Sequence, residues 1–306
     1  MNAYDTMMAR LAAGGVVLLD GGTGTELERR GVPMDPDAWC GPATGEHADV
    51  LEEIHRAYIA AGAEIITANT FSGSRLMLAG AGLGDQVETL ARQAVATAFA
   101  ARGERADVLI AGSMSHQIPV VRGGDRSRRD DRPDAATMSA AFHELSGILA
   151  DSGCDLLLLE MMYAPDRMAQ ALPAARACGL PVWLGLSGRY GADGALLSFD
   201  RDEDLPFDDV LAGIDFTGID AVGIMHTPVT LCGEALEAIA RHWPGPRFVY
   251  PDSGYFRMPH WQFEDVIAPA DLHTAAADWV AAGASAIGGC CGLSPEHIAA
   301  LAPLKR

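Results

Sequence analysis

The chain has 306 residues, which is long enough to bury a sizeable core. Of these, 49% are hydrophobic and 21% are charged, a composition that excludes a disordered chain. Its 22 Lys and Arg against 41 Asp and Glu give a formal net charge of -19, which disfavours nucleic-acid partners and anionic membrane surfaces. Without a signal-peptide core, a membrane-length apolar stretch or a disulfide-like pattern in its six cysteines, the sequence predicts a cytoplasmic protein with reduced thiols.

Eight short runs rich in Val, Ile and Leu recur along the chain, with amphipathic stretches between them. The runs span residues 16–20, 64–70, 107–114, 155–162, 181–188, 221–226, 247–253 and 286–291. Apolar residues at helical spacing predict helices in the intervals, for example at 45–61 and 85–102. This alternation is typical of βαβ units, and eight of them predict an α/β fold, a (β/α)8 TIM barrel formed by residues 1–306 as a single domain.

Every predicted strand ends in polar or unusual residues. These include Asp20, Asn69, Ser113, Glu160, Ser187, His226, Asp252 and the pair Cys290-Cys291. In (β/α)8 barrels the active site lies at the C-terminal ends of the strands, so these side chains are expected to face one site.

Two segments match no regular element. One is polar and runs over 117–133, with Arg122, Arg126, Arg128, Arg129 and Arg132. The other, 255–270, is aromatic and contains proline. Both are expected to be loops, either exposed connectors or lids over the site.

The pair Cys290-Cys291 stands between Gly288-Gly289 and Gly292. Neighbouring residues of a regular strand point to opposite faces, but the glycines allow the backbone to twist so that both thiols could serve one metal ion. Buried cysteines also act as small hydrophobic residues, so the spacing leaves both interpretations open. A catalytic zinc site usually has three protein ligands, and His226 is the best candidate for the third.

These motifs resemble those of the homocysteine S-methyltransferase family, over nearly the whole chain. The matching stretches are 19–27 (LDGGTGTEL), 55–63, 67–71 (TANTF), 111–113, 158–160, 250–254 (YPDSG) and 288–292 (GGCCG). The resemblance implies a (β/α)8 barrel whose zinc ion is held by three cysteines. Where the family has the first of these, in a Gly-x-Asn-Cys pattern, this chain reads Gly223-Ile224-Met225-His226.

Two interpretations of this departure compete. In the first, His226 replaces the missing cysteine and completes a zinc site with Cys290 and Cys291. In the second, zinc is lost or weakened and the protein does something else. We favour the first, because imidazole is a good zinc ligand and the glycines around the cysteines are retained.

The resemblance implies methyl transfer from a sulfonium donor, of the S-methylmethionine or S-adenosylmethionine type, to the thiol of homocysteine or a related thiol. No catalytic residue is expected beyond the metal-activated substrate thiol. By resemblance, Asp20, the backbone of Gly21 and Glu160 would bind the amino group of the substrate, although the carboxylates could instead cap helices.

Aromatic residues are the candidates for the donor site. Trp39 matches one wall of the aromatic cage of betaine-using relatives, whereas Ser72 and Met161 stand where tyrosines are expected, which argues against betaine. Candidate aromatic partners for a sulfonium are Tyr255, Phe256 and Trp261, which could equally pack within a lid.

Two other functions are alternatives: a metal-dependent barrel hydrolase, which the absence of a His-x-His strand motif disfavours, and an inactive barrel that binds a thiol or a metal. The expected partners are a small-molecule thiol and a methyl donor. Exposed apolar patches could support a homo-oligomer, but no sequence feature demonstrates one.

Overall fold

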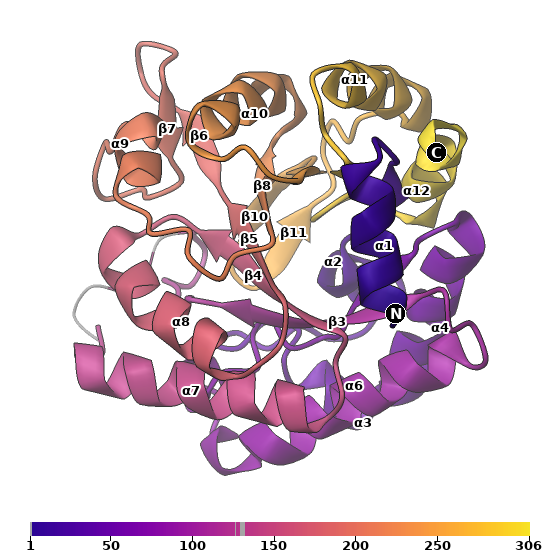
Figure 1. The fold of residues 1–306 in the computed structure, drawn as a ribbon. Helices are drawn as coiled ribbons and strands as arrows, with labels where there is room; N and C mark the ends of the chain where they lie inside the picture. The colour runs from indigo at the N-terminus through magenta and orange to yellow at the C-terminus, as the bar shows by residue number, and fades with distance from the viewer. Residues whose placement is uncertain (1, 126, 129–131) are drawn as a thin grey trace.

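The computed structural model describes residues 2–125, 127–128 and 132–306, so Arg126 and Arg129 of the predicted polar loop lie outside the described residues. Eight parallel strands form its centre (Figure 1). They are β1 (Val17–Leu18), β2 (Ile65–Thr67), β3 (Leu109–Ser115), β4 (Leu156–Met162), β5 (Val182–Leu186), β8 (Ala221–Pro228), β9 (Arg247–Asp252) and β12 (Ala286–Ile287). Each lies within or overlaps one of the eight predicted runs.

The sheet is closed into a barrel. Its strand order is β1-β12-β9-β8-β5-β4-β3-β2, and a parallel bridge between Leu19 and Ile65 connects the two outer strands. The backbone N–H of Asp20 donates to the carbonyl of Ile65 at 3.0 Å across this seam. The predicted (β/α)8 barrel is therefore confirmed.

Helices surround the barrel. Those that follow barrel strands along the chain are α2 (Thr23–Arg29), α4 (Ala48–Ala61), α6 (Val87–Arg102), α7 (Ala135–Asp151), α8 (Pro165–Ala177), α9 (Phe207–Ala212), α10 (Val229–His242), α11 (Pro269–Ala281) and α12 (Pro295–Leu301), with the short α3 (Ala43–Glu46) and α5 (Arg75–Leu78) between them. The predicted helices at 45–61 and 85–102 correspond to α4 and α6. Helix α4 buries Leu51, Ile54 and Tyr58 and is followed by Gly62, whose φ of 109° favours glycine.

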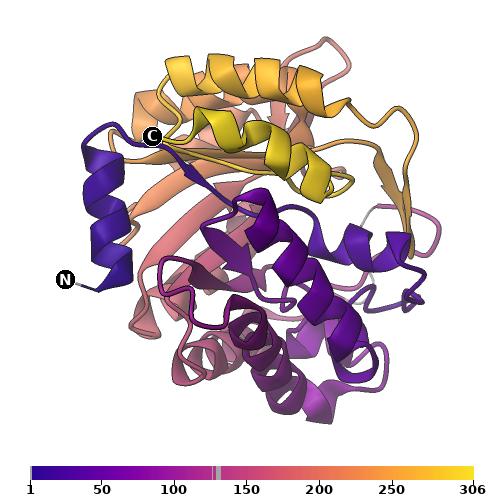
Figure 2. The same cartoon turned by 90° about the vertical axis from the view of Figure 1, so that its right-hand side faces the viewer.

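Helix α1 (Ala3–Ala12) closes the end of the barrel at which the strands begin. Its Tyr4 hydroxyl accepts a hydrogen bond from the Trp183 indole at 3.1 Å and donates one to Asp220 at 3.1 Å. Met7 and Leu11 pack in the same cluster as the inward-facing barrel residues. In Figure 2, α1 lies at the left edge, so the opposite end of the barrel is left for a site. Within the described part of the chain, no helix has both the length and the hydropathy needed to cross a membrane.

The expectation of irregular structure over 255–270 is wrong for its first half. Strands β10 (Tyr255–Arg257) and β11 (His260–Gln262) form an antiparallel hairpin in which Phe256 pairs with Trp261. Pro259 argued against a strand, but it stands in the connection, where its missing N–H removes no ladder hydrogen bond. A second hairpin, β6 (Gly188–Tyr190) with β7 (Leu196–Ser198), was not predicted, because three-residue strands carry little periodic signal.

The described part of the predicted loop at 117–133 is irregular apart from one bridge between Val120 and Ser127. It is joined to the β10–β11 hairpin, because Gly123 donates its backbone N–H to the Met258 carbonyl at 2.8 Å and Met258 donates to Gly124 at 2.9 Å. The loop and the hairpin therefore form a connected cover at the C-terminal end of the barrel.

Candidate active site

His226 lies near the end of β8, where the pairing with β9 shifts register between Met225 and Pro228. Its φ of 43° is in the left-handed region that non-glycine residues rarely occupy. The ring packs edge-on against Phe199 and Trp261, with centroid distances of 5.2 and 5.8 Å. The register shift and these two rings together set the direction of the imidazole.

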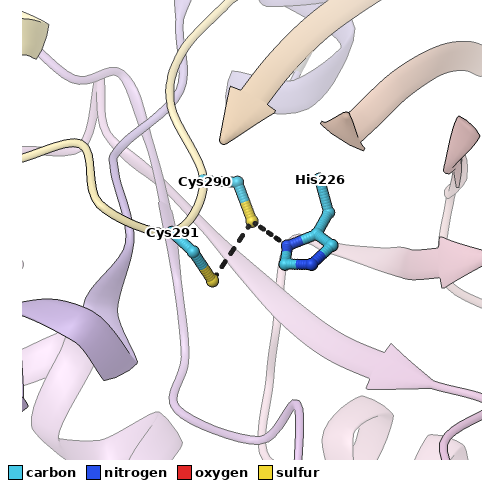
Figure 3. Close-up of side chains that lie close together, drawn as sticks. All are labelled: His226, Cys290 and Cys291. Carbon is cyan, nitrogen blue, oxygen red and sulfur yellow. Dashed lines mark hydrogen bonds between the residues drawn. The ribbon is translucent and has the colours of Figure 1, made fainter. Parts of the chain in front are cut away.

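Cys290 and Cys291 follow β12, which β9 separates from β8, and their side chains lie close to that of His226 (Figure 3). The two Sγ atoms are 3.8 Å apart, and Sγ of Cys290 is 3.6 Å from Nδ1 of His226. At Gly292, φ is 81° and a Cβ atom would lie 1.9 Å from the Ser253 carbonyl oxygen, so only glycine fits there. The glycine is needed for the turn that carries both thiols.

The three side chains fit a zinc ion. A tetrahedral ion with bonds of about 2.3 Å to sulfur and about 2.0 Å to nitrogen holds two sulfurs about 3.8 Å apart, and a sulfur and a nitrogen about 3.5 Å apart. The separations of 3.8 and 3.6 Å are close to these values, and the ligand atoms of all three residues lie within 4.8 Å of one another. Three ligand atoms from the protein would leave a fourth position of a tetrahedral ion open, as in catalytic zinc sites.

Asp252, at the end of β9, lies behind His226, with its Oδ2 3.7 Å from Nε2 of the imidazole. Burial raises the pKa of Asp252 to about 7. Burial, together with a smaller effect of the Arg201 charge, lowers the pKa of His226 to about 3. The imidazole is therefore neutral at physiological pH, which leaves one ring nitrogen with a lone pair for a metal.

A cavity of about 110 Å³ adjoins these ligands, large compared with the roughly 10–15 Å³ that a single water molecule needs by the same kind of measure. Its aromatic lining consists of Trp39, Phe71, Tyr163, Phe199, Tyr250, Phe256 and Trp261. Trp39, Phe256 and Trp261 were predicted, and Ser72 and Met161 also line the cavity. Tyr255 is 37% exposed and is not among the lining residues.

Phe71, Tyr163 and Phe199 were missed by sequence reasoning. Phe71 and Tyr163 come directly after the predicted runs 64–70 and 155–162, and Phe199 directly follows the unpredicted hairpin β6–β7. Only their position after strand ends could have suggested them.

Glu160, in β4, lines the cavity and accepts hydrogen bonds from the hydroxyls of Ser113 and Tyr250. Burial raises its pKa to about 7, although both hydrogen bonds oppose this shift. A cation bound beside this carboxyl group would lower its pKa, because a positive charge stabilises the ionised form.

Asp20 is fully buried and does not line the cavity, and neither does Gly21. The Asp20 carboxylate accepts from the backbone N–H of Thr67 at 2.6 Å and from its hydroxyl at 3.0 Å. Burial raises the pKa of Asp20 to about 7, with a smaller contribution from the charge of Glu160. Helix α2 has no side-chain cap, so Asp20 does not serve as one; it supports Thr67, which does line the cavity.

Known proteins of one kind align with nearly the whole chain. The family model "Homocysteine S-methyltransferase" matches residues 17–304. A homocysteine S-methyltransferase from Escherichia coli is 29% identical, with 98% of this chain and 99% of the relative aligned. A selenocysteine Se-methyltransferase from Brassica oleracea is 26% identical, covering 94% of this chain and 88% of that protein.

A solved structure agrees with these matches. The crystal structure of the homocysteine methyltransferase MmuM from Escherichia coli in its metallated form superposes with a TM-score of 0.74 at 26% identity. The superposition covers 97% of this chain and 99% of that one.

Proposed function

Because the chain belongs to the homocysteine S-methyltransferase family and is a methyltransferase, we propose that it moves a methyl group from a sulfonium donor to the thiol of homocysteine or a related thiol. The donor would be of the S-methylmethionine or S-adenosylmethionine type. The observation that carries this proposal is the trio His226, Cys290 and Cys291, which lines the cavity with zinc-like spacing. We also infer that residues 1–306 act as a single catalytic domain.

In this proposal, Nδ1 of His226 and the Sγ atoms of Cys290 and Cys291 hold zinc. Zinc bound there would lower the pKa of a substrate thiol, which is about 8.5 in water, and keep it as the nucleophilic thiolate. The protein's own contribution is to direct the thiol: the rings of Phe199 and Trp261 hold His226, and the glycine turn holds both cysteines.

Glu160 is the best-placed group for the ammonium of an amino-acid substrate, since its carboxyl lines the cavity and is held by Ser113 and Tyr250. The roles predicted for Asp20 and Gly21 would be indirect, with Asp20 acting through Thr67. The Glu160 carboxyl beside the cavity would favour an aminated thiol over a simple alkyl thiol.

The aromatic lining suits a cationic donor, with Trp39, Phe256 and Trp261 as the proposed contacts. Trp39 and Phe256 pack edge-to-face at 5.8 Å, which leaves aromatic surface toward the cavity for cation–π contact. During transfer the bond between the donor sulfur and the methyl carbon breaks as the thiolate sulfur forms its own. The donor leaves as a neutral thioether, and this loss of opposite charges is favoured in a cavity that excludes water.

The test is to measure zinc content and methyl loss from S-methylmethionine and from S-adenosylmethionine, with and without homocysteine. We expect bound zinc and strictly thiol-dependent transfer, both lost in Cys290→Ser and Cys291→Ser. Cys178→Ser, outside the cavity, is the matched control and should retain both. Donor hydrolysis without a thiol would indicate the hydrolase alternative, and zinc binding without turnover would indicate an inactive barrel.

A further inference from the structure

Asp252 is a partly buried carboxyl group outside the three-residue ligand set. Its Oδ2 lies 3.7 Å from Nε2 of His226, the ring nitrogen that does not face Cys290. The charge of Arg201 also acts on Asp252. The side chains of His226 and Asp252 are 8% and 12% exposed, so water competes little for this contact.

The imidazole therefore has two differently placed nitrogens. Nδ1 faces Sγ of Cys290 at 3.6 Å, and Nε2 faces Asp252. A neutral imidazole can offer a lone pair to a metal at one nitrogen only if its proton is on the other. An acceptor beside Nε2 selects the tautomer in which Nδ1 is free to ligate, and such carboxylate contacts orient histidine ligands and raise their basicity.

We propose, on the basis of the metal centre in the proposed function, that Asp252 is a positioning residue for His226. Its carboxyl group faces Nε2 and favours the tautomer with the proton on that nitrogen, which leaves Nδ1 as the ligand nitrogen. The backbone supports this pairing. The register shift in β8 sets Pro228 opposite Asp252, and His226 takes its left-handed conformation within the shifted segment.

The experiment compares zinc affinity, by competition with a chelator, in wild type, Asp252→Asn, His226→Cys and the double variant. Asp252→Asn should weaken zinc binding about 10- to 100-fold in the wild-type background. In the His226→Cys background the same change should leave the affinity unchanged or strengthen it, because a thiolate has no N–H to donate and is repelled by the carboxylate.

Two further measurements exclude trivial explanations. Thermal melting of the metal-free proteins reports whether Asp252→Asn folds, and Asp220→Asn, at the other end of the barrel, should bind zinc as wild type does. Visible absorption of the cobalt-substituted protein should shift in Asp252→Asn, since a merely structural role would leave the ligand field unchanged.

The outcomes separate the two proposals. Equal losses in the His226 and His226→Cys backgrounds, or no loss in either, would overturn the positioning role. If His226→Ala binds zinc as tightly as wild type, the proposed metal centre itself is wrong. If His226→Ala loses zinc while Asp252→Asn keeps it, only the role of Asp252 is refuted.

Discussion

At the residue scale, three residues that line the cavity have backbone conformations that are costly without a compensating contact. φ is 43° at His226, 51° at Met161 and 52° at Trp39. His226 and Met161 each lie within a register irregularity, in β8 and in β4, and each such conformation costs on the order of 1–3 kcal/mol. Irregularities of this kind re-aim side chains: one directs His226 to Cys290, and the other lies beside Glu160.

Glu160 leads to a prediction about pH. Its pKa of about 7 in the folded protein is above the unfolded value, so its contribution to stability is present at low pH and is lost as pH rises through 7. Glu160→Gln removes this loss of stability, because glutamine does not ionise. In the metal-free protein, the variant should gain stability relative to wild type between about pH 4.3 and 7, reaching about 3 kcal/mol at pH 8.

Urea unfolding of both metal-free proteins at pH 5 and pH 8 measures this gain. A difference in unfolding free energy that is the same at both pH values would contradict it. Buried His226 contributes with the opposite sign, since its lowered pKa costs stability as pH falls below about 6.5, so only the difference between variant and wild type isolates Glu160.

At the scale of elements, the β10–β11 hairpin brings Phe256 and Trp261 over the cavity and is attached to helix α2 through one side chain. The Glu28 carboxylate contacts Nδ1 of His260 at 2.7 Å and accepts from the backbone N–H of Trp261 at 3.0 Å. The hairpin is also bonded to the loop at 123–124. Glu28 therefore anchors the element that carries Trp261, one of the two rings packed against His226.

Glu28→Ala should release this anchor while leaving the metal ligands in place. We expect faster amide hydrogen exchange over 255–262 and a KM for the sulfonium donor raised about 10-fold, the equivalent of about 1.4 kcal/mol. Zinc affinity should change much less than the donor KM, because Phe199 still packs against His226. Glu53→Ala, an exposed residue of α4, is the control, and equal effects of the two substitutions would refute the anchoring role.

At the scale of the whole molecule, the two ends of the barrel differ: one is closed by packed side chains, and the other holds the candidate site. Helix α1 closes one end through Tyr4, Met7 and Leu11, while the ligands, carboxyls and aromatic rings gather at the other. Figure 2 shows α1 on the left and the gold hairpin near the right edge. A change at the closed end should therefore affect unfolding without affecting the site.

Leu11→Ala tests this separation. Leu11 is 5% exposed, and its truncation should lower the free energy of unfolding by about 2–5 kcal/mol. Below the melting temperature, zinc content and donor KM should match wild type. Thr6→Ala, on the exposed side of α1, should change the stability by less than about 0.5 kcal/mol. A loss of zinc in Leu11→Ala would show that the two ends are coupled.

Much of this molecule could be predicted without coordinates. The alternation of apolar runs and amphipathic stretches determines the barrel, since a strand buried on both faces must be apolar and a covering helix needs one apolar stripe. Polar strand ends such as Glu160, His226 and Cys290 identified the site because parallel strands present the same end to one face.

The tertiary structure decided what periodicity cannot encode. Whether Cys290 and Cys291 converge on His226 depends on a register shift and a glycine turn, and whether Asp20 reaches the cavity depends on how Thr67 covers it. The shared cavity of Phe71 and Phe199 and the approach of Asp252 to His226 bring together segments that are separate in the chain. The physical reason is that pattern and composition act through local backbone geometry, whereas a site is set by distances between elements, which only the packed barrel determines.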